Sequence, residues 1–318
     1  MKTVYLTIMM ISAFLMLILP LSAKDNLQGE PTVALPLTQT ETPQDEPDKV
    51  RLKLTASDTV TEISLEDYIF GVVAAEMPAL YEEEALKAQA VAAYTFYVIQ
   101  KEKNKEQAFD ISDDYTVHQS FINADLAREK WGDGADTYEN KIRSCVKAVL
   151  GQTVLYEGSP ATTLYHAISY GVTENAAEVW GGNYPYLVSV DSSWDKLEKN
   201  YLYEKTFKAE ELKSLLSSLA EVKDLEKNCI TDIARTDAGG VKNLKVSGTE
   251  ISGGDLRQAL SLRSSNFEVN FSNGVYTFTT KGYGHSIGMS QYGAHYMAMQ
   301  GKIYKEILLH YYTGCKVE

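Results

Sequence analysis

The chain of 318 residues is poor in cysteine and in positive charge, and both shortages exclude classes of protein. Its three cysteines are too few for a disulfide framework, and none lies in a C-x-x-C pair or another metal-ligand spacing. One pair could form a bridge, but partly buried thiols are the simpler interpretation. The net charge of -13 argues against nucleic acid as a partner, because phosphate binding requires a basic surface.

Two further features are missing from the sequence. No internal repeat is found, which argues against a solenoid or a propeller. No G-x-S-x-G segment occurs, so the chain lacks the nucleophile elbow of α/β-hydrolases. The composition that remains is 44% hydrophobic and 10% aromatic, which is typical of a globular protein with a substantial core.

The N-terminal segment is apolar and contains no charged side chain from residue 4 to residue 23. Its length is close to the ~20 residues that a helix needs to cross a bilayer. Cleavage after Leu21-Ser22-Ala23 would make residues 1–23 a signal peptide, and retention would make them a membrane anchor. We favour the anchor, which predicts a single-pass protein of the cell membrane with its body on the extracytoplasmic side.

Residues 24–49 are expected to be a disordered linker, because residues 28–47 are rich in Pro, Thr, Gln and Glu without an apolar period. The folded domain is then residues 50–318. Helical periods predict helices over 65–75, 82–103, 139–148, 208–227, 256–262 and 305–312. Alternation and turn residues predict strands over 50–54, 59–64, 151–156, 162–166, 230–235, 241–247, 266–271 and 274–280.

These elements indicate an α+β fold, with mixed helices and antiparallel sheets around a groove. Residues 191–269 carry none of the motifs described below. They are therefore a candidate for a smaller inserted subdomain.

The first candidate site residue is Glu76, at the end of an apolar helical segment. Ser64 is placed to cap the start of this helix, and Pro78 prevents its continuation beyond about residue 77. An apolar setting and the carbonyl end of a helix both favour a protonated carboxyl group. Such a carboxyl group can act as a general acid, although most glutamates in this context are surface residues or caps.

The second candidate is the glycine-rich segment 282–294, Gly-Tyr-Gly-His-Ser-Ile-Gly-Met-Ser-Gln-Tyr-Gly-Ala. Its glycines allow the backbone to approach a ligand closely, and Ser290 and Gln291 offer hydrogen-bonding groups. His285 is its titratable side chain. The alternative is a tight turn in which the histidine is structural.

The third candidate is the polar segment 166–180, which follows a predicted strand. His166 and Ser169 lie where the strand end would bring side chains to a groove. Thr173-Glu174-Asn175 is expected to cap a short helix that ends at Trp180. A hydrolase that pairs one of these histidines with a serine, and a zinc site built from the histidines, stay open as alternatives.

These three segments together resemble the stage II sporulation protein D family of lytic transglycosylases. The resemblance covers about residue 50 to the C-terminus. Its motifs occur in the family's order: residues 66–93 with Glu-Ala-Leu-Lys-Ala-Gln-Ala, residues 166–187, and the run Gly-His-x-x-Gly-Met-Ser-Gln-Tyr-Gly-Ala.

The resemblance implies cleavage of the bond between N-acetylmuramic acid and N-acetylglucosamine in peptidoglycan during engulfment of the forespore. It implies a 1,6-anhydro product, Glu76 as the catalytic acid, and no cofactor or metal. Cell-wall amidase and membrane components of the engulfment machinery are the implied partners. The motif positions implied to bind substrate are Lys87, Gln89, His166, Ser169, His285, Ser290, Gln291 and Tyr292.

The chain departs from the family pattern at three points. Tyr94 stands where relatives usually have arginine, and residues 166–171 read His-Ala-Ile-Ser-Tyr-Gly instead of His-Ser-x-Ser-Gly-Gly. Some relatives hold a metal with a cysteine five residues before a histidine, and here Asp113 takes that position before His118. A second function therefore stays open, namely a non-catalytic peptidoglycan-binding protein that enhances an amidase.

Overall fold

The computed structural model describes residues 49–224 and 226–318. The described chain divides into two compact units, which are residues 165–293 and residues 49–164 together with 294–318. Helices and largely antiparallel sheets alternate along it, so the predicted α+β class is confirmed.

The predicted anchor, residues 1–23, lies outside the described residues, as does the predicted linker apart from Lys49. Within the described ranges, no helix is both long enough and apolar enough to span a bilayer. The expected single-pass localisation in the cell membrane is therefore corrected.

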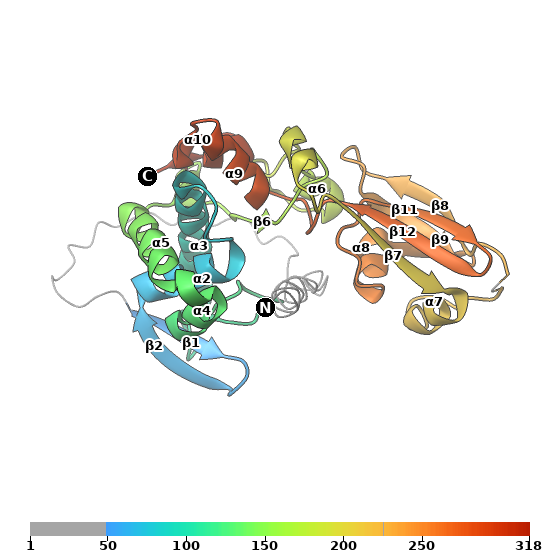
Figure 1. Cartoon of the computed structure of the whole chain (residues 1–318), viewed down its shortest axis with the longest axis horizontal. Helices are drawn as coiled ribbons and strands as arrows, with labels where there is room; N and C mark the ends of the chain where they lie inside the picture. Colours follow the sequence, from blue (N-terminus) through green and yellow to red (C-terminus); the bar gives the residue numbers. More distant parts are fainter. Residues whose placement is uncertain (1–48, 225) are drawn as a thin grey trace. The chain divides into compact units, whose positions relative to one another are not determined.

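The unit formed by residues 49–164 and 294–318 is built around three helices, α2 (Leu65–Glu76), α3 (Glu83–Lys103) and α5 (Ala135–Val149), which pack on one another (Figure 1). The shorter helices α4 (Ala124–Trp131) and α10 (Tyr304–Tyr311) pack against α5 and α3. The middle of α2 is buried on every side, because all residues from 68 to 74 are apolar or glycine. Such a helix is held by packing around its whole circumference.

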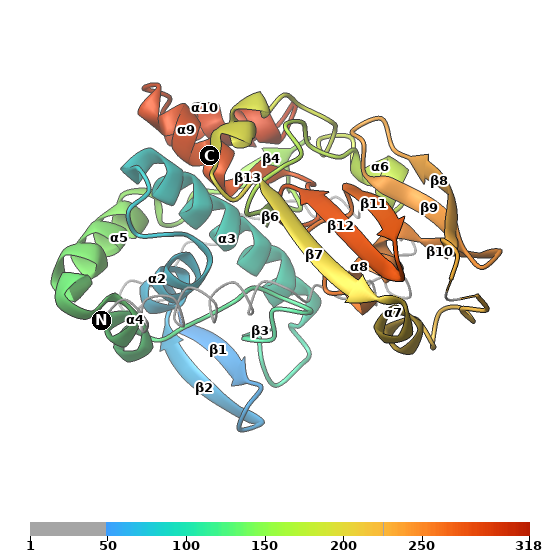
Figure 2. The same cartoon turned by 45° about the vertical axis from the view of Figure 1, so that its right-hand side comes forward.

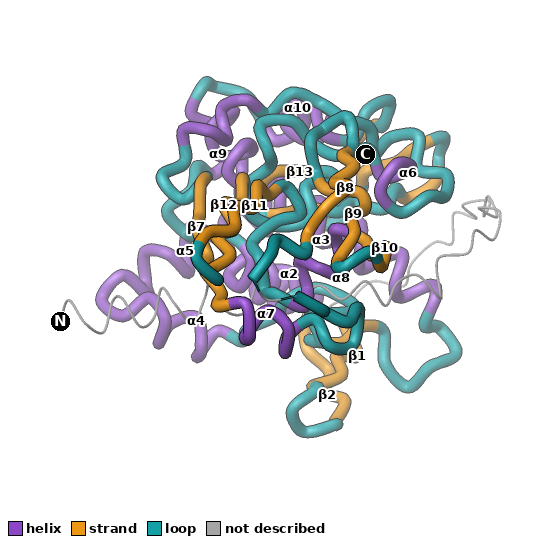
Figure 3. The backbone as a smooth tube through the Cα atoms, turned by 90° about the vertical axis from the view of Figure 1, so that its right-hand side faces the viewer, coloured by secondary structure: helices purple, strands orange, loops and turns teal. Residues whose placement is uncertain are grey.

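Small sheets complete this unit. The two predicted strands β1 (Lys49–Leu54) and β2 (Thr59–Ser64) pair as an antiparallel hairpin (Figure 3). β3 (Ile111–Ser112) runs parallel to β1. A second sheet contains β14 (Lys316–Val317), β4 (Val154–Tyr156) and β5 (Ser159–Pro160). The C-terminal strand thus pairs with a strand about 160 residues earlier in the chain.

The unit of residues 165–293 contains two antiparallel sheets. One has the order β11 (Phe267–Ser272), β12 (Val275–Lys281), β7 (Leu202–Lys208), and the other has the order β10 (Thr249–Ser252), β9 (Val241–Val246), β8 (Ile230–Arg235) (Figure 2). β12 alternates buried and half-buried residues, so Tyr276, Phe278 and Thr280 face inward. A shared core lies between the sheets and the helices α7 (Ala209–Leu215) and α8 (Gly253–Ala259).

This core is drawn from residues 207–278, a span that overlaps the predicted inserted subdomain at 191–269. The remaining elements of the unit are short: β6 (Tyr165–His166), α6 (Ala176–Val179), a 3₁₀ helix (Ser193–Leu197) and β13 (Met289–Ser290). Helix α9 (Gln291–Met299) runs from this unit into the other. The boundaries of an inserted subdomain stay a prediction.

The predicted helix over 208–227 is wrong in length, because α7 ends at Leu215. Apolar residues beyond this point, including Leu216, Ala220 and Val222, are buried in the core, but they reach it through successive turns. Serines 217 and 218 lie just after the end of α7. Serine favours turns because its hydroxyl group bonds nearby backbone groups, and Ser217 Oγ donates to the Ser214 carbonyl. Helices α4 and α9 and strand β7 were not predicted.

Candidate functional site

Glu76 is the last residue of α2, as the sequence predicts. Ser64 caps the start of the helix by accepting a hydrogen bond from the Asp67 amide at 3.0 Å. At the other end, the Met77 amide donates to the Val73 carbonyl before Pro78 stops the helix. Glu76 is half-buried, and its Oε1 accepts a hydrogen bond from the backbone amide of Ser120 at 3.0 Å. A rigid helix and a backbone donor thus fix the position of this carboxyl group.

The segment that supplies the Ser120 amide packs unusually close to α2. A Cβ atom at Gly71 would lie against the Phe121 ring and 2.5 Å from the Ile122 carbonyl oxygen, so only glycine allows this approach. The Ile122 amide donates to the Gly71 carbonyl, and Gln119 Nε2 donates to the Tyr68 hydroxyl at 3.0 Å. The segment is therefore held on both sides of Ser120.

Lys130, on α4, lies at the same end of α2. Its ammonium group donates to the Ala74 carbonyl at 3.2 Å, which is two residues before Glu76. Burial lowers the pKa of Lys130, and the nearby charge of Glu76 partly opposes this. Sequence analysis missed this residue, because a separation of more than fifty residues leaves no pattern that joins it to Glu76.

Lys87 and Gln89 lie on α3, in the same unit as Glu76. Lys87 is half-buried and paired with Glu84 at 2.6 Å, and this hydrogen bond raises the pKa of Lys87. Gln89 is fully buried. Their contact with a ligand stays a prediction.

The other predicted residues belong to the unit of residues 165–293, where parallel pairing of β6 with β13 puts Ser290 opposite His166. The His166 Nδ1–H donates to the Ile287 carbonyl at 3.1 Å, and the ring centroids of His166 and His285 are 5.6 Å apart. The Trp180 ring lies 5.6 Å from the His285 ring. The structure thus brings the second and third sequence motifs together.

Both histidines are held in the neutral form. Burial lowers the pKa of His166 to about 3, and burial, with a smaller effect of the Arg257 charge, lowers the pKa of His285 well below its usual value. His285 Nδ1 accepts a hydrogen bond from the Ile287 amide at 3.1 Å, and a hydrogen bond to the Tyr165 carbonyl fixes the other nitrogen as the donor. Neither ring is suited to carry a proton near neutral pH.

Asp195, in the 3₁₀ helix, connects this cluster. The Ser169 amide donates to Asp195 Oδ2 at 2.6 Å, and the hydroxyl groups of Ser169, Ser290 and Ser192 also stabilise the carboxylate. Burial is the largest influence and raises the pKa of Asp195. No sequence motif marks this aspartate, and only the fold brings it beneath Ser169 and Ser290.

Several predicted substrate-binding residues are buried. Ser169 and Ser290 are fully enclosed, and Gln291 is 3% exposed. Ser290 Oγ accepts a hydrogen bond from the Gly293 amide at 3.1 Å and so closes the first turn of α9. Tyr292 is half-buried, and its amide donates to the Ala167 carbonyl. These contacts make the serines parts of a buried hydrogen-bond network, and their direct contact with a ligand stays a prediction.

The third motif also contains a buried carboxyl group. Asn175 caps α6, as expected, but Glu174 points inward and accepts a hydrogen bond from Thr236 Oγ1 at 2.8 Å. Burial raises the pKa of Glu174 to about 7. Glu174 therefore links the loop to the turn between β8 and β9.

The alternative sites receive little support. All three cysteines are free and buried, and burial raises the pKa of the Cys145 thiol to about 11, which disfavours a thiolate nucleophile. His118 Nδ1 is hydrogen-bonded to Ser112 Oγ at 2.7 Å. Within residues 49–224 and 226–318, no three histidines, cysteines or carboxylates come together in a way that could hold a metal ion.

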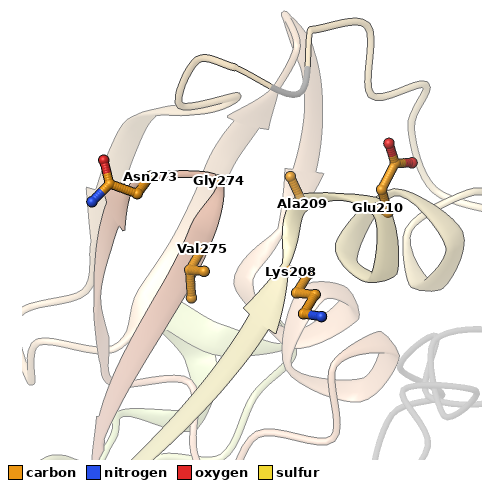
Figure 4. A pocket seen from close by; sticks show the side chains of 6 residues that line it. All are labelled: Lys208, Ala209, Glu210, Asn273, Gly274 and Val275. Atoms are coloured by element: carbon orange, nitrogen blue, oxygen red, sulfur yellow. The ribbon is translucent and has the colours of Figure 1, made fainter.

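A surface pocket of about 360 Å³ lies where β7 meets α7 and where β11 turns into β12 (Figure 4). The side chains of Glu210 and Asn273 point away from one another in it, and Lys208 points in a third direction. No residue predicted from sequence lines this pocket. Polar groups that do not converge make a poor ligand site.

Comparison with known proteins adds to this geometry. A family model described as Stage II sporulation protein matches residues 54–156. Stage II sporulation protein D of Bacillus amyloliquefaciens is 38% identical over 277 residues, which cover 86% of this chain and 80% of that protein. The Bacillus subtilis (strain 168) protein of the same name is 36% identical, covering 87% and 81%. The amidase enhancer of Bacillus subtilis is 29% identical over 77% of this chain and 39% of its own length.

Proposed function

Because the chain belongs to the stage II sporulation protein D family, we propose that it is a lytic transglycosylase of peptidoglycan that acts during sporulation. Its reaction breaks the bond between N-acetylmuramic acid and N-acetylglucosamine and leaves a 1,6-anhydro end. Forespore engulfment is the proposed setting, with a cell-wall amidase as a partner. The observation that carries the proposal is the placement of Glu76.

Glu76 has three features that suit a general acid. It ends a helix whose middle is fully buried, so its backbone is rigid. Its Oε1 is oriented by the Ser120 amide, while the residue keeps part of its surface exposed. A positioned carboxyl group in such a setting contributes roughly 10²- to 10⁴-fold to a proton-transfer step.

The proposed reaction balances with a single carboxyl group. Protonated Glu76 donates its proton to the glycosidic oxygen as the C1–O bond breaks, which frees the N-acetylglucosamine hydroxyl. The C6 hydroxyl of the muramic acid ring then bonds to C1, and its proton passes to the Glu76 carboxylate. No water is consumed and the acid is regenerated, whereas a hydrolase commonly needs a second carboxylate to activate water or act as nucleophile.

The decisive experiment compares glycan fragments released from purified sacculi by the wild type and by Glu76→Gln. We expect anhydro-ended fragments, one water lighter than hydrolysis products, from the wild type and a loss of at least about 100-fold from the variant. Glu66→Gln is the matched control, because Glu66 lies in the first turn of the same helix and faces Arg143 and Lys147 at 3.6 Å. Unchanged release by Glu76→Gln, or fragments with hydrolysed ends, would refute the proposal.

The similarity to an amidase enhancer favours a second candidate, a peptidoglycan-binding protein that stimulates an amidase without cutting glycan. Tyr94, at a position where relatives usually carry arginine, fits a weakened enzyme. This candidate predicts that the protein sediments with sacculi, releases no glycan fragments and accelerates stem-peptide release by an added amidase equally well with Glu76→Gln.

A further inference from the structure

Arg257, on α8, is a buried cation that the proposed reaction does not use. The residue is 8% exposed. The hydrogen bonding of its side chain within the described residues is limited to Nε, which donates to the Leu262 carbonyl at 3.3 Å. None of the ion pairs among residues 49–224 and 226–318 involves it. Its two terminal nitrogens are therefore left without an acceptor in the described part of the chain.

The groups around Arg257 are neutral. Its charge lowers the pKa of Tyr170, Tyr283, His166 and His285, which places these four side chains within electrostatic reach of the guanidinium. Both imidazoles are neutral near pH 7, and neither phenol is ionised there. None of these four side chains therefore supplies a negative charge to Arg257.

Glu174 is a buried carboxyl group of the same unit, and it forms no ion pair with Arg257. It is bonded to Thr236, and the other charges that influence it belong to Glu178 and Asp237. Burial raises its pKa to about 7, so this carboxyl group is partly protonated near neutral pH. Arg257 stays positive regardless, because a guanidinium keeps its proton even when burial lowers its pKa.

A buried charge without a partner is strongly unfavourable, so proteins pair buried charges or use them to bind ligands. A structural role does not require arginine here, since a single hydrogen bond to the Leu262 carbonyl could come from a neutral side chain. Two free, coplanar nitrogens are instead the arrangement that binds a carboxylate through two parallel hydrogen bonds.

We propose that Arg257, a buried guanidinium whose terminal nitrogens have no acceptor in the described part of the chain, forms a subsite that binds a carboxylate of the ligand. Given the proposed function, on which this inference rests, the ligand is peptidoglycan. It offers carboxylates from two sources, the lactyl group of muramic acid where the stem peptide is absent, and the stem peptide where it is present. The part of Arg257 that remains exposed is the surface through which this group is reached.

The test measures binding to the full-length protein by titration calorimetry with three probes. The first is the disaccharide of N-acetylglucosamine and N-acetylmuramic acid with a free lactyl carboxylate, and the second is the same disaccharide with that group as its methyl amide. The third carries a stem peptide on the lactyl group. We expect a carboxylate-bearing probe to bind about 10- to 100-fold more tightly than the methyl amide, the range for a charge-assisted hydrogen bond. A preference for the first or the third probe identifies the source.

Variants assign the effect to Arg257. Arg257→Gln is expected to bind the acid and the methyl amide equally, and Arg257→Lys to keep part of the difference. The matched control is Arg235→Gln, because Arg235 already has a carboxylate partner, Glu268, at 3.1 Å; it should leave the difference unchanged. If Arg257→Gln does not fold, the wild-type comparison and Arg257→Lys decide the question.

Equal binding of acid and methyl amide by the wild type would overturn the subsite, as would a difference that persists in Arg257→Gln. The readout is independent of glycan cleavage. If Glu76→Gln still cleaves glycan while the wild type prefers the carboxylate, then the proposed function has failed and the subsite stands.

Discussion

The candidate acid of one unit and the histidine–serine cluster of the other are held in different ways. In residues 49–164 with 294–318, Glu76 stands at the end of a buried apolar helix and is half-exposed. In residues 165–293, His166, Ser169, Asp195 and Ser290 are buried and bonded to one another or to the backbone. Glu76, the proposed acid, therefore stands on a rigid support, and the buried cluster fixes the shape of its loops from within.

This difference separates two kinds of substitution. Changing an exposed reactive group should reduce activity and leave the free energy of unfolding nearly unchanged. Changing a member of a buried network should lower stability first, because donors and acceptors lose their partners. Glu76→Gln, described above, is the extreme case of the first kind, and the following variants test both kinds in order of expected size.

Asp195→Ala is expected to lower the free energy of unfolding most, by about 3 kcal/mol, because the amide of Ser169 and the hydroxyls of Ser290 and Ser192 lose their acceptor. Urea denaturation at pH 7 measures the change. Asp191→Ala is the control, since Asp191 is exposed and should change stability by no more than about 0.5 kcal/mol. Equal effects of the two variants would mean that the buried network is not what stabilises this unit.

Glu174→Gln tests the same network through pH. Glu174 has a folded-state pKa of about 7 against an ordinary value of 4.5, so between these values the folded protein keeps a proton that the unfolded chain has lost. The free energy of unfolding should therefore fall by about 2 to 3 kcal/mol as pH rises from 4.5 to 7, and by only about 0.4 kcal/mol more above pH 7, where the folded protein loses the rest of this proton. In Glu174→Gln this decline should disappear.

Glu250→Gln, at an exposed glutamate on β10, serves as the control and should keep the pH dependence. A decline that is the same in Glu174→Gln would show that another group causes it.

Gly71→Ala tests the support of Glu76. The added methyl group would collide with Phe121 and the Ile122 carbonyl, so we expect a loss of about 2 kcal/mol in unfolding free energy. The segment that orients Glu76 through Ser120 must shift, so glycan cleavage should fall as well. Phe121→Leu in the same chain should restore part of both losses, and full activity and stability of Gly71→Ala alone would contradict the packing argument.

Lys130→Met should have the smallest effect, a loss of less than about tenfold in glycan cleavage. The charge of Glu76 favours the protonated form of Lys130, so by reciprocity Lys130 favours the ionised form of Glu76. Its removal should shift the pH profile of cleavage to higher pH. Lys130→Arg keeps the charge and should keep the profile; a profile that is identical in all three proteins would exclude an electrostatic role.

Sequence patterns predicted the local elements best where one physical cause dominates. Ser64, the apolar residues of α2 and Pro78 define both ends of that helix, and the strands predicted at 230–235 and 241–247 match β8 and β9 closely. The predicted helix failed beyond residue 215. Apolar residues there recur with a helical spacing, but they reach the core through successive turns.

The candidate site was predicted only in part. His166 and Ser290 were found as members of separate motifs, and the structure shows that they pair across β6 and β13. Asp195, Lys130 and Arg257 were missed. Each is an ordinary polar residue in its own segment, and its significance depends on neighbours far away in the chain.

The sequence by itself determined the family, the α+β class and the position of Glu76 at a helix end, because these depend on local patterns that a chain carries in any context. Tertiary structure decided which polar groups are buried, which charges have partners and which are left without one. Those properties arise from desolvation and from contacts between distant segments, and local sequence patterns predict neither.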